Sequence, residues 1–119
     1  MKHILSLSYD SMVLSTRQMI LESEGYRVTS ALGFPDALEA CVYGGDFDLV
    51  ILGHSIPSKE KSGLITILRN YCKAPIVSLF GPGDAPVRGA DIQVDLAEGP
   101  VALVNAVRSV LSSPGPQAS

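Results

Sequence analysis

A chain of 119 residues with 46% hydrophobic and 18% charged residues suits one domain with a single core, and this composition excludes an intrinsically disordered chain. The 9 basic and 12 acidic residues form no basic cluster, so nucleic-acid binding gets no support. No apolar run approaches the length of a membrane span and no signal peptide is evident, so we expect a cytoplasmic protein.

The chain opens with a predicted strand and helix. The strand is predicted over residues 3–8, with Ile4-Leu5-Ser6-Leu7 at its centre. Asp10 or Ser11 can cap the helix that follows. We expect this helix to end near Glu24, because Gly25 tolerates the left-handed backbone of a helix stop. Its inner face is expected to consist of Val13, Thr16, Ile20 and Leu21.

A second strand and helix come next. Residues 26–31 alternate between apolar and polar side chains, which is typical of a strand near a sheet edge. Pro35 is suited to the first turn of a helix, and Asp36 lies where the helix dipole favours an acid. We expect this helix to end at Gly44-Gly45 and to face inward with Leu38, Cys41 and Val42.

The unbroken apolar run at residues 49–52 predicts a central strand that is buried on both faces. Ligands of parallel sheets bind just beyond the carboxyl ends of such strands, and here that end carries Gly53-His54-Ser55. A loop is expected over residues 55–62. The next helix, over about residues 63–72, is predicted to face inward with Leu64, Ile65, Leu68, Tyr71 and Cys72.

The last third of the chain holds two more predicted strands, at residues 75–79 and 92–95. The segment between them has two prolines and three glycines, so we expect the helix of this crossover to be missing or reduced to a turn. Residues 113–119 are expected to form a disordered tail or a linker stub. Pro100 begins a final helix, which is predicted to face inward with Leu103, Val104, Val107, Val110 and Leu111.

The order of these elements predicts an α/β fold. Strands that alternate with helices indicate a parallel sheet with helices on both faces and right-handed crossovers. We expect a flavodoxin-like fold with five strands in the order 2-1-3-4-5, formed by one domain over residues 1–112.

The two cysteines, Cys41 and Cys72, are too few and too far apart for a zinc site. Both fall on apolar faces of predicted helices. We therefore expect buried, reduced thiols rather than reactive ones.

Several local motifs resemble the receiver domain of bacterial two-component response regulators. Each motif is weak alone, but their order and spacing together are specific for this fold. The resemblance covers residues 2 to about 112 and implies a role in phosphorelay signalling. The motifs are Glu24-Gly25-Tyr26-Arg27-Val28, Ala37-Leu38-Glu39-Ala40, Phe47-Asp48-Leu49-Val50-Ile51-Leu52 with Pro57 after it, Ala74-Pro75-Ile76-Val77 and Gly89-Ala90-Asp91.

The resemblance also implies a phosphorylation site, and this sequence lacks it. An ordinary receiver uses an aspartate nucleophile, an acidic pair that holds Mg²⁺, and a hydroxyl and a lysine that bind the phosphoryl oxygens. The aspartate position falls on Gly53, and no lysine follows Lys73. We therefore expect no metal and no cofactor. The remaining positions fall on Ser8 and Tyr9, Phe80, and Leu96, of which we expect Tyr9, Phe80 and Leu96 to plug the vacated pocket.

His54 beside Ser55 invites a catalytic interpretation, but the Gly-x-Ser-x-Gly elbow of hydrolases lacks its last glycine here. The other histidine, His3, is expected at the opposite end of the sheet. We therefore expect loop residues without chemistry, and a protein that is not an enzyme. The alternative is a small-molecule-binding or enzymatic domain that reuses the pocket around Gly53, His54, Ser55 and Tyr9.

The phosphorylation residues are missing, although the predicted order of strands and helices is that of a receiver. We therefore interpret the chain as a pseudo-receiver. Such a module acts by protein–protein interaction and independently of phosphorylation. Its expected partner is a signalling protein, an output domain, or a second copy of the chain in a homodimer. The interaction surface is expected on the fifth strand and the last helix, at Gln93, Ala102, Asn105, Ala106, Arg108 and Ser109.

Overall fold

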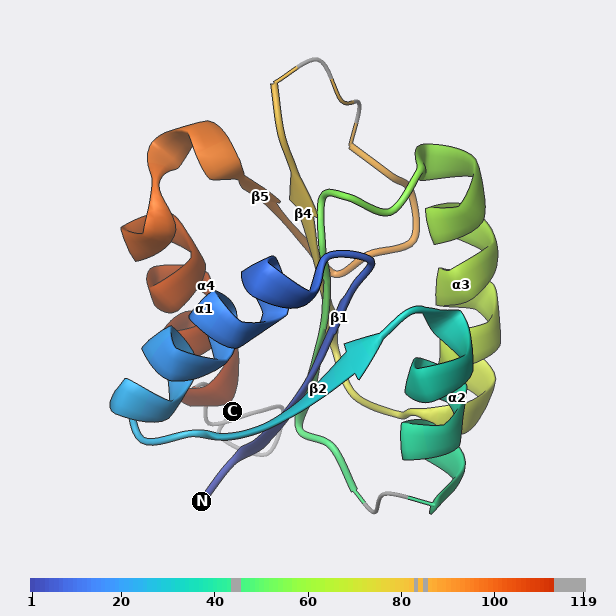
Figure 1. Cartoon of the computed structure of the whole chain (residues 1–119), viewed down its shortest axis with the longest axis horizontal. Helices are drawn as coiled ribbons and strands as arrows, with labels where there is room; N and C mark the ends of the chain where they lie inside the picture. Colours follow the sequence, from blue (N-terminus) through green and yellow to red (C-terminus); the bar gives the residue numbers. More distant parts are fainter. Residues whose placement is uncertain (44–45, 83, 85, 113–119) are drawn as a thin grey trace, which may run out of the picture.

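Strands that are almost entirely buried form the centre of the fold (Figure 1). The computed structural model describes residues 1–43, 46–82, 84 and 86–112. Its elements in chain order are β1 (His3–Ser8), α1 (Ser11–Ser23), β2 (Arg27–Leu32), α2 (Phe34–Tyr43), β3 (Leu49–Leu52), α3 (Ser58–Tyr71), β4 (Ile76–Phe80), β5 (Ile92–Asp95), the 3₁₀ turn η1 (Leu96–Glu98) and α4 (Pro100–Ser112).

The five strands form one parallel sheet in the order β2-β1-β3-β4-β5, which confirms the predicted flavodoxin-like topology. Every residue of β1 and β3 is buried, because helices cover both faces of the middle of the sheet. Buried and exposed side chains alternate along much of β2, as expected for the edge strand that it is.

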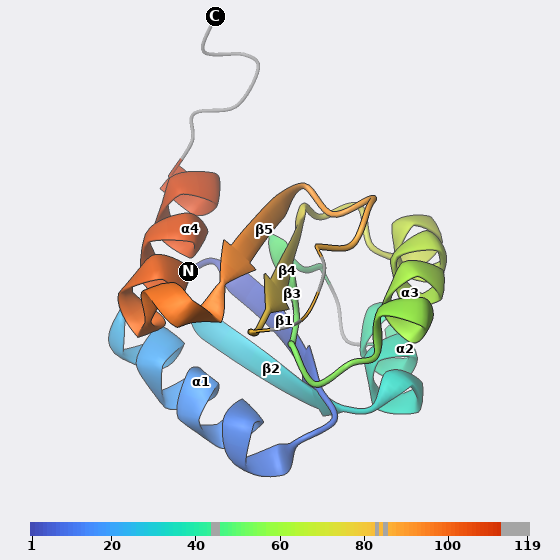
Figure 2. The ribbon, with the colours of Figure 1, turned by 90° about the horizontal axis from the view of Figure 1, so that it is seen from above.

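The helices cover the sheet in two pairs. Seen from above, α1 and α4 lie on one face and α2 and α3 on the other (Figure 2). Two apolar cores follow from this arrangement. One joins Leu21 of α1 to Leu103 and Val107 of α4, and the other joins Ala37 of α2 to Leu68 of α3.

The crossover from β4 to β5 contains no helix among its described residues, which agrees with the prediction from its prolines and glycines. Val87, which is 6% exposed, packs into the core beside α2 and α3. The end of the crossover is held by Asp91, whose carboxylate accepts a hydrogen bond from the Ile76 backbone N–H at 2.7 Å and pairs with Arg69 at 2.9 Å.

Several predicted helix faces were wrong. In α1 the buried residues are Leu14, Arg17 and Leu21, whereas Thr16 is exposed and Val13 and Ile20 are only partly buried. Val42 of α2 and Tyr71 of α3 are exposed. Helix α3 begins at Ser58, five residues before the predicted start, so most of the predicted loop is helical.

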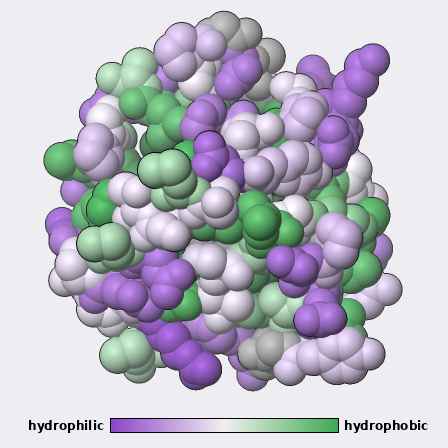
Figure 3. Space-filling view, in the orientation of Figure 1, coloured by the Kyte–Doolittle hydropathy of each residue, from purple (hydrophilic) through white to green (hydrophobic). Residues whose placement is uncertain are grey.

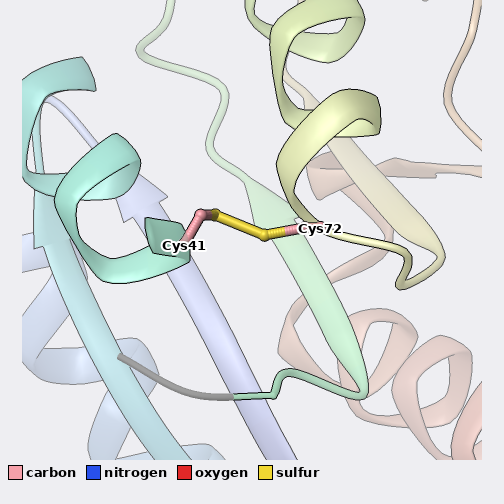
Figure 4. Close-up of a disulfide and its surroundings, with 2 residues drawn as sticks. All are labelled: Cys41 and Cys72. Atoms are coloured by element: carbon pink, nitrogen blue, oxygen red, sulfur yellow. A yellow bond between two sulfur atoms is a disulfide. The ribbon is translucent and has the colours of Figure 1, made fainter. Parts of the chain in front are cut away.

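The expectation of two reduced thiols was also wrong. Cys41 in α2 and Cys72 at the end of α3 form a disulfide, with their Cα atoms 6.0 Å apart (Figure 4). The bond crosslinks the two helices that cover the same face of the sheet. Cys72 is buried and Cys41 is partly buried, as predicted, but the closeness of the two cysteines across two different helices was not visible in the sequence.

No helix in the described part of the chain combines the length and the apolar character that crossing a membrane needs. The predicted domain boundary at residue 112 stays a prediction. The predicted tail, residues 113–119, lies outside the described residues.

Candidate functional site

The ends of β1 and β3 meet at the carboxyl edge of the sheet. The Gly53 backbone N–H donates to the Leu7 carbonyl at 2.9 Å, which continues the β1–β3 ladder by one step. The Ser8 hydroxyl lies 3.0 Å from the Ser55 hydroxyl, and the Tyr9 backbone N–H donates to Ser55 at 3.2 Å. The sequence-predicted positions Ser8, Tyr9, Gly53 and Ser55 are therefore close together.

A buried arginine fills the space beside Gly53. A Cβ atom on residue 53 would lie 3.1 Å from Nη2 of Arg17, 3.1 Å from the Leu7 carbonyl oxygen and 3.3 Å from the Ser8 Cβ. Arg17 comes from the inner face of α1 and is only 5% exposed. A side chain at residue 53 would thus lie directly against the guanidinium of Arg17.

The hydrogen bonds of Arg17 to described residues are all to neutral groups. Its Nη1 donates to the Ser6 hydroxyl at 2.9 Å and to the Leu7 carbonyl at 3.5 Å. The two ion pairs formed between described residues join Arg69 to Asp91 and Arg108 to Glu24, and neither includes Arg17. Burial lowers the pKa of Arg17 to about 10, because the charged form loses its hydration.

A second cation, Lys61, approaches the same edge from the first turn of α3. Its Nζ donates to the Leu79 carbonyl at 2.7 Å, and the residue is 3% exposed. Burial lowers the pKa of Lys61. The charge of Asp84 acts in the opposite direction, and the charge of Arg17 lowers the pKa further. The buried groups at this carboxyl edge of the sheet therefore carry positive charge.

The acids near this edge are engaged elsewhere. Asp10 caps α1, as predicted, by accepting from the backbone N–H groups of Met12 and Val13. Asp84 accepts from the Gly81 N–H at 3.0 Å, and Glu60 accepts from the Tyr9 hydroxyl at 2.8 Å. Among the described residues, no three His, Cys, Asp or Glu side chains gather as a metal site would require.

The expected plug of three bulky side chains is wrong. Tyr9 is 38% exposed, and its hydroxyl points to Glu60 on α3. Burial raises the pKa of the Tyr9 hydroxyl, and the hydrogen bond and charge of Glu60 raise it further. Phe80 and Leu96 are only partly buried, and Leu96 lines a separate cavity between α1 and α4. The space beside Gly53 is filled by Arg17 instead.

The two histidines, His3 and His54, lie in different surroundings, and neither forms a hydrogen bond with a serine hydroxyl among the described residues. His54 is exposed, and the Ser55 hydroxyl makes its hydrogen bonds with Ser8 and the Tyr9 backbone. His3 is buried near the start of β1, where its Nε2 lies 2.7 Å from the Thr29 hydroxyl. Neither arrangement aligns a serine nucleophile with a histidine base.

No model of a known protein family matches the chain, and no curated protein matches it in sequence. Solved structures do match. A response regulator from Clostridium difficile is 18% identical, with a TM-score of 0.82 over 97% of this chain and 99% of that chain. A CheY-like receiver domain from Methanospirillum hungatei is 24% identical, with a TM-score of 0.77 over 94% of each chain. This chain has the receiver fold.

The regulator TrrA from Thermotoga maritima has the same fold. It is 25% identical to this chain, with a TM-score of 0.76 over 92% of this chain and 99% of TrrA. TrrA has been solved with Mg²⁺ and beryllofluoride, and also in complex with the histidine kinase ThkA. These ligands and this partner belong to TrrA.

On the receiver fold, the predicted interaction surface lies along β5 and α4. Asn105, Arg108 and Ser109 are exposed, as expected. The other members of the predicted surface, Gln93, Ala102 and Ala106, are partly buried, and Arg108 pairs with Glu24 of α1 at 2.6 Å. The side-chain amide of Gln93 donates to the Val87 carbonyl. Much of this surface is therefore already engaged within the chain.

Sequence reasoning missed Arg17 and Lys61 in this receiver fold. Lys61 falls in the expected loop over residues 55–62, and no role was predicted for Arg17. A signal for Arg17 was present, since Leu14, Arg17 and Leu21 follow the i, i+3, i+7 spacing of one helix face.

Proposed function

We propose that the chain is a degenerate receiver domain, a signalling module that accepts no phosphoryl group and works through contacts with other proteins. The observation that carries the proposal is the close contact between the Arg17 guanidinium and Gly53. A nucleophilic carboxylate is missing at the tip of β3, and a guanidinium occupies the adjacent space. Phosphoryl transfer to this edge lacks its nucleophile, and a buried guanidinium lies against the place where that side chain would begin.

The charges at the edge support the same conclusion. Mg²⁺ binds oxygen ligands and is repelled by nearby fixed cations. Here Arg17 and Lys61 are the buried charged groups, while the surrounding carboxylates of Asp10, Asp84 and Glu60 each accept a hydrogen bond within the chain. We therefore propose a non-catalytic module without a metal, placed in the cytoplasm with other two-component proteins.

The proposed partner is a signalling protein, an output domain or a second copy of the chain. Receiver folds bind such partners, as the complex of TrrA with ThkA illustrates. The exposed side chains of α4 at Asn105 and Ser109 are available for such a contact. A homodimer through this face would be detected by sedimentation equilibrium, and Asn105→Arg should weaken it, whereas Thr66→Arg on the exposed side of α3 should not.

Incubation with acetyl phosphate and Mg²⁺, followed by intact mass, tests the loss of phosphotransfer. We expect no mass increase, while an intact receiver such as TrrA, treated in parallel, should gain one phosphoryl group. A phosphorylated product of this chain would refute the proposal. Because Gly53 has no side chain, a modified residue elsewhere would be found by peptide mapping, and that outcome would refute it too.

A further inference from the structure

A cavity of about 350 Å³ lies between α1 and the start of α4. Its walls are mostly apolar and include Val13 and Ile20 of α1, Leu79 of β4, Leu96 of η1 and Leu103 of α4. In Figure 3 a recess with apolar atoms at its base opens on the upper left, near the start of α4. The volume is within the range of natural small-molecule sites.

The charge in this cavity has one sign. Arg17 and His54 are the titratable residues that line it, and no acidic residue among those described does so. Arg17 is 5% exposed, so its charge is held inside the molecule, whereas His54 stands exposed at the margin. An anion that entered the cavity would meet a cation and no carboxylate.

The buried guanidinium has unused donors. Its hydrogen bonds to described residues come from Nη1 alone, and the acceptors are the Ser6 hydroxyl and the Leu7 carbonyl. Nη2 and Nε make none to this part of the chain. A guanidinium presents five N–H groups and bonds carboxylates best with two of them in parallel. The protein therefore holds one end of the group and leaves other donors for a ligand.

Filling the space beside Gly53 does not by itself require a charge. An uncharged side chain of similar length would fill the same space without the loss of hydration that a buried cation suffers. Arg17 instead brings to the wall of an apolar cavity a charge that forms no ion pair with any described residue. This combination of shape and charge points to a ligand that supplies both an apolar body and one negative group.

We propose that the cavity between α1 and α4 binds a small amphipathic monocarboxylate, whose carboxylate pairs with Arg17 while its apolar body lies between the two helices. A phosphate monoester fits this site less well, because its additional charged oxygens would face walls that are mostly apolar. The site lies beside the lost phosphorylation pocket, and it does not depend on whether phosphotransfer is absent.

Calorimetric titration with three probes separates the contributions of charge and tail. Octanoate carries both, 1-octanol carries the tail alone, and acetate carries the charge alone. We expect octanoate to bind the full chain about tenfold to a hundredfold more tightly than octanol, as charge-assisted hydrogen bonds imply. Acetate should show no measurable binding. Equal affinity for octanoate and octanol, or no binding of octanoate below its micellar range, would overturn the proposal.

Two variants locate the site. Arg17→Met removes the charge and should reduce octanoate affinity to that of octanol, and Thr16→Phe should block the cavity from its exposed lip. Arg27→Met is the matched control and should bind as the native chain does, because Arg27 is exposed on β2 and forms no ion pair with a described residue. Unchanged octanoate affinity in folded Arg17→Met would refute the assignment. If that variant does not fold, the acid-to-alcohol ratio of the native chain and the Thr16→Phe result decide the question.

Discussion

The guanidinium of Arg17 lies directly beside Gly53 at the tip of the central strand β3. Nη2 of Arg17 lies 3.1 Å from the position that a Cβ on residue 53 would take, which is closer than ordinary van der Waals contact. A side chain at residue 53 would therefore require Arg17 to move by a few tenths of an ångström from its present position. In the proposed degenerate receiver, the glycine that stands at the nucleophile position is also the residue beside which the buried cation lies.

The first prediction concerns this contact. Gly53→Ala should lower the free energy of unfolding by about 1–3 kcal/mol, because the new methyl also meets the Leu7 carbonyl and the Ser8 Cβ, which are parts of the chain that cannot swing away. Urea denaturation measures the change. Gly63→Ala is the control: nothing lies within 4 Å of its added Cβ, and an alanine inside α3 should stabilise the protein by about 0.5–1 kcal/mol. Equal effects of the two substitutions would contradict the steric account.

The second prediction concerns Lys61 and pH. Burial lowers the pKa of Lys61 in the folded state below its ordinary value of 10.5, so the unfolded chain holds this proton more tightly. Below the pKa of the folded state, the charged Lys61 therefore lowers the free energy of unfolding by its full amount. This destabilisation decreases as the pH rises from that pKa toward 10.5. The stability difference between Lys61→Met and the native chain should shift in favour of the native chain over this window.

Denaturation curves at several pH values test the Lys61 prediction. Lys59→Met is the control, because Lys59 is exposed on the same turn of α3. Its stability difference from the native chain should stay constant with pH. A constant difference for Lys61→Met as well would show that the buried ammonium has the same proton affinity in both states.

The sheet could be predicted from the sequence because its signals are local. Runs such as residues 49–52 are apolar throughout, and the prolines and glycines between β4 and β5 exclude a helix by backbone geometry alone. The start of α3 was missed because Ser58 follows Pro57, which supplies no side-chain cap, and a run of charged residues there resembled a loop.

The site could be predicted only as a set of missing groups. Gly53 and Ser8 fall where expected, since strand register follows from the apolar pattern. What replaced the missing groups depends on contacts between distant segments. Helix periodicity places Arg17 on the inner face of α1, but it does not show that this face meets the tip of β3. The disulfide likewise needs the ends of α2 and α3 to meet, and the sequence pattern does not show that contact.

The third prediction concerns the helix-free crossover. Asp91→Ala should destabilise the protein by about 1–3 kcal/mol, because it leaves the Ile76 backbone N–H at the start of β4 without its acceptor. Arg69→Ala should cost less, about 0–1 kcal/mol, since its ion pair with Asp91 is solvent-exposed. Both values come from chemical denaturation. A larger loss for Arg69→Ala would mean that the bond of Arg69 to the Gly89 carbonyl, and not Asp91, holds the crossover.

The last prediction concerns the bond between Cys41 and Cys72, which closes a segment of 31 residues. Crosslinking restricts the unfolded chain, and a loop of this length is worth about 3–4 kcal/mol in the chain-entropy account. Reduction should therefore lower the melting temperature of the native chain, whereas a Cys41→Ala/Cys72→Ala variant should melt at the same temperature with and without reductant. Thiol labelling of the denatured protein provides the direct check, and two reactive thiols in protein purified without reductant would contradict the disulfide. Because cytoplasmic reductants keep most thiols reduced, the same labelling performed on freshly lysed cells would show which state the protein occupies where it works.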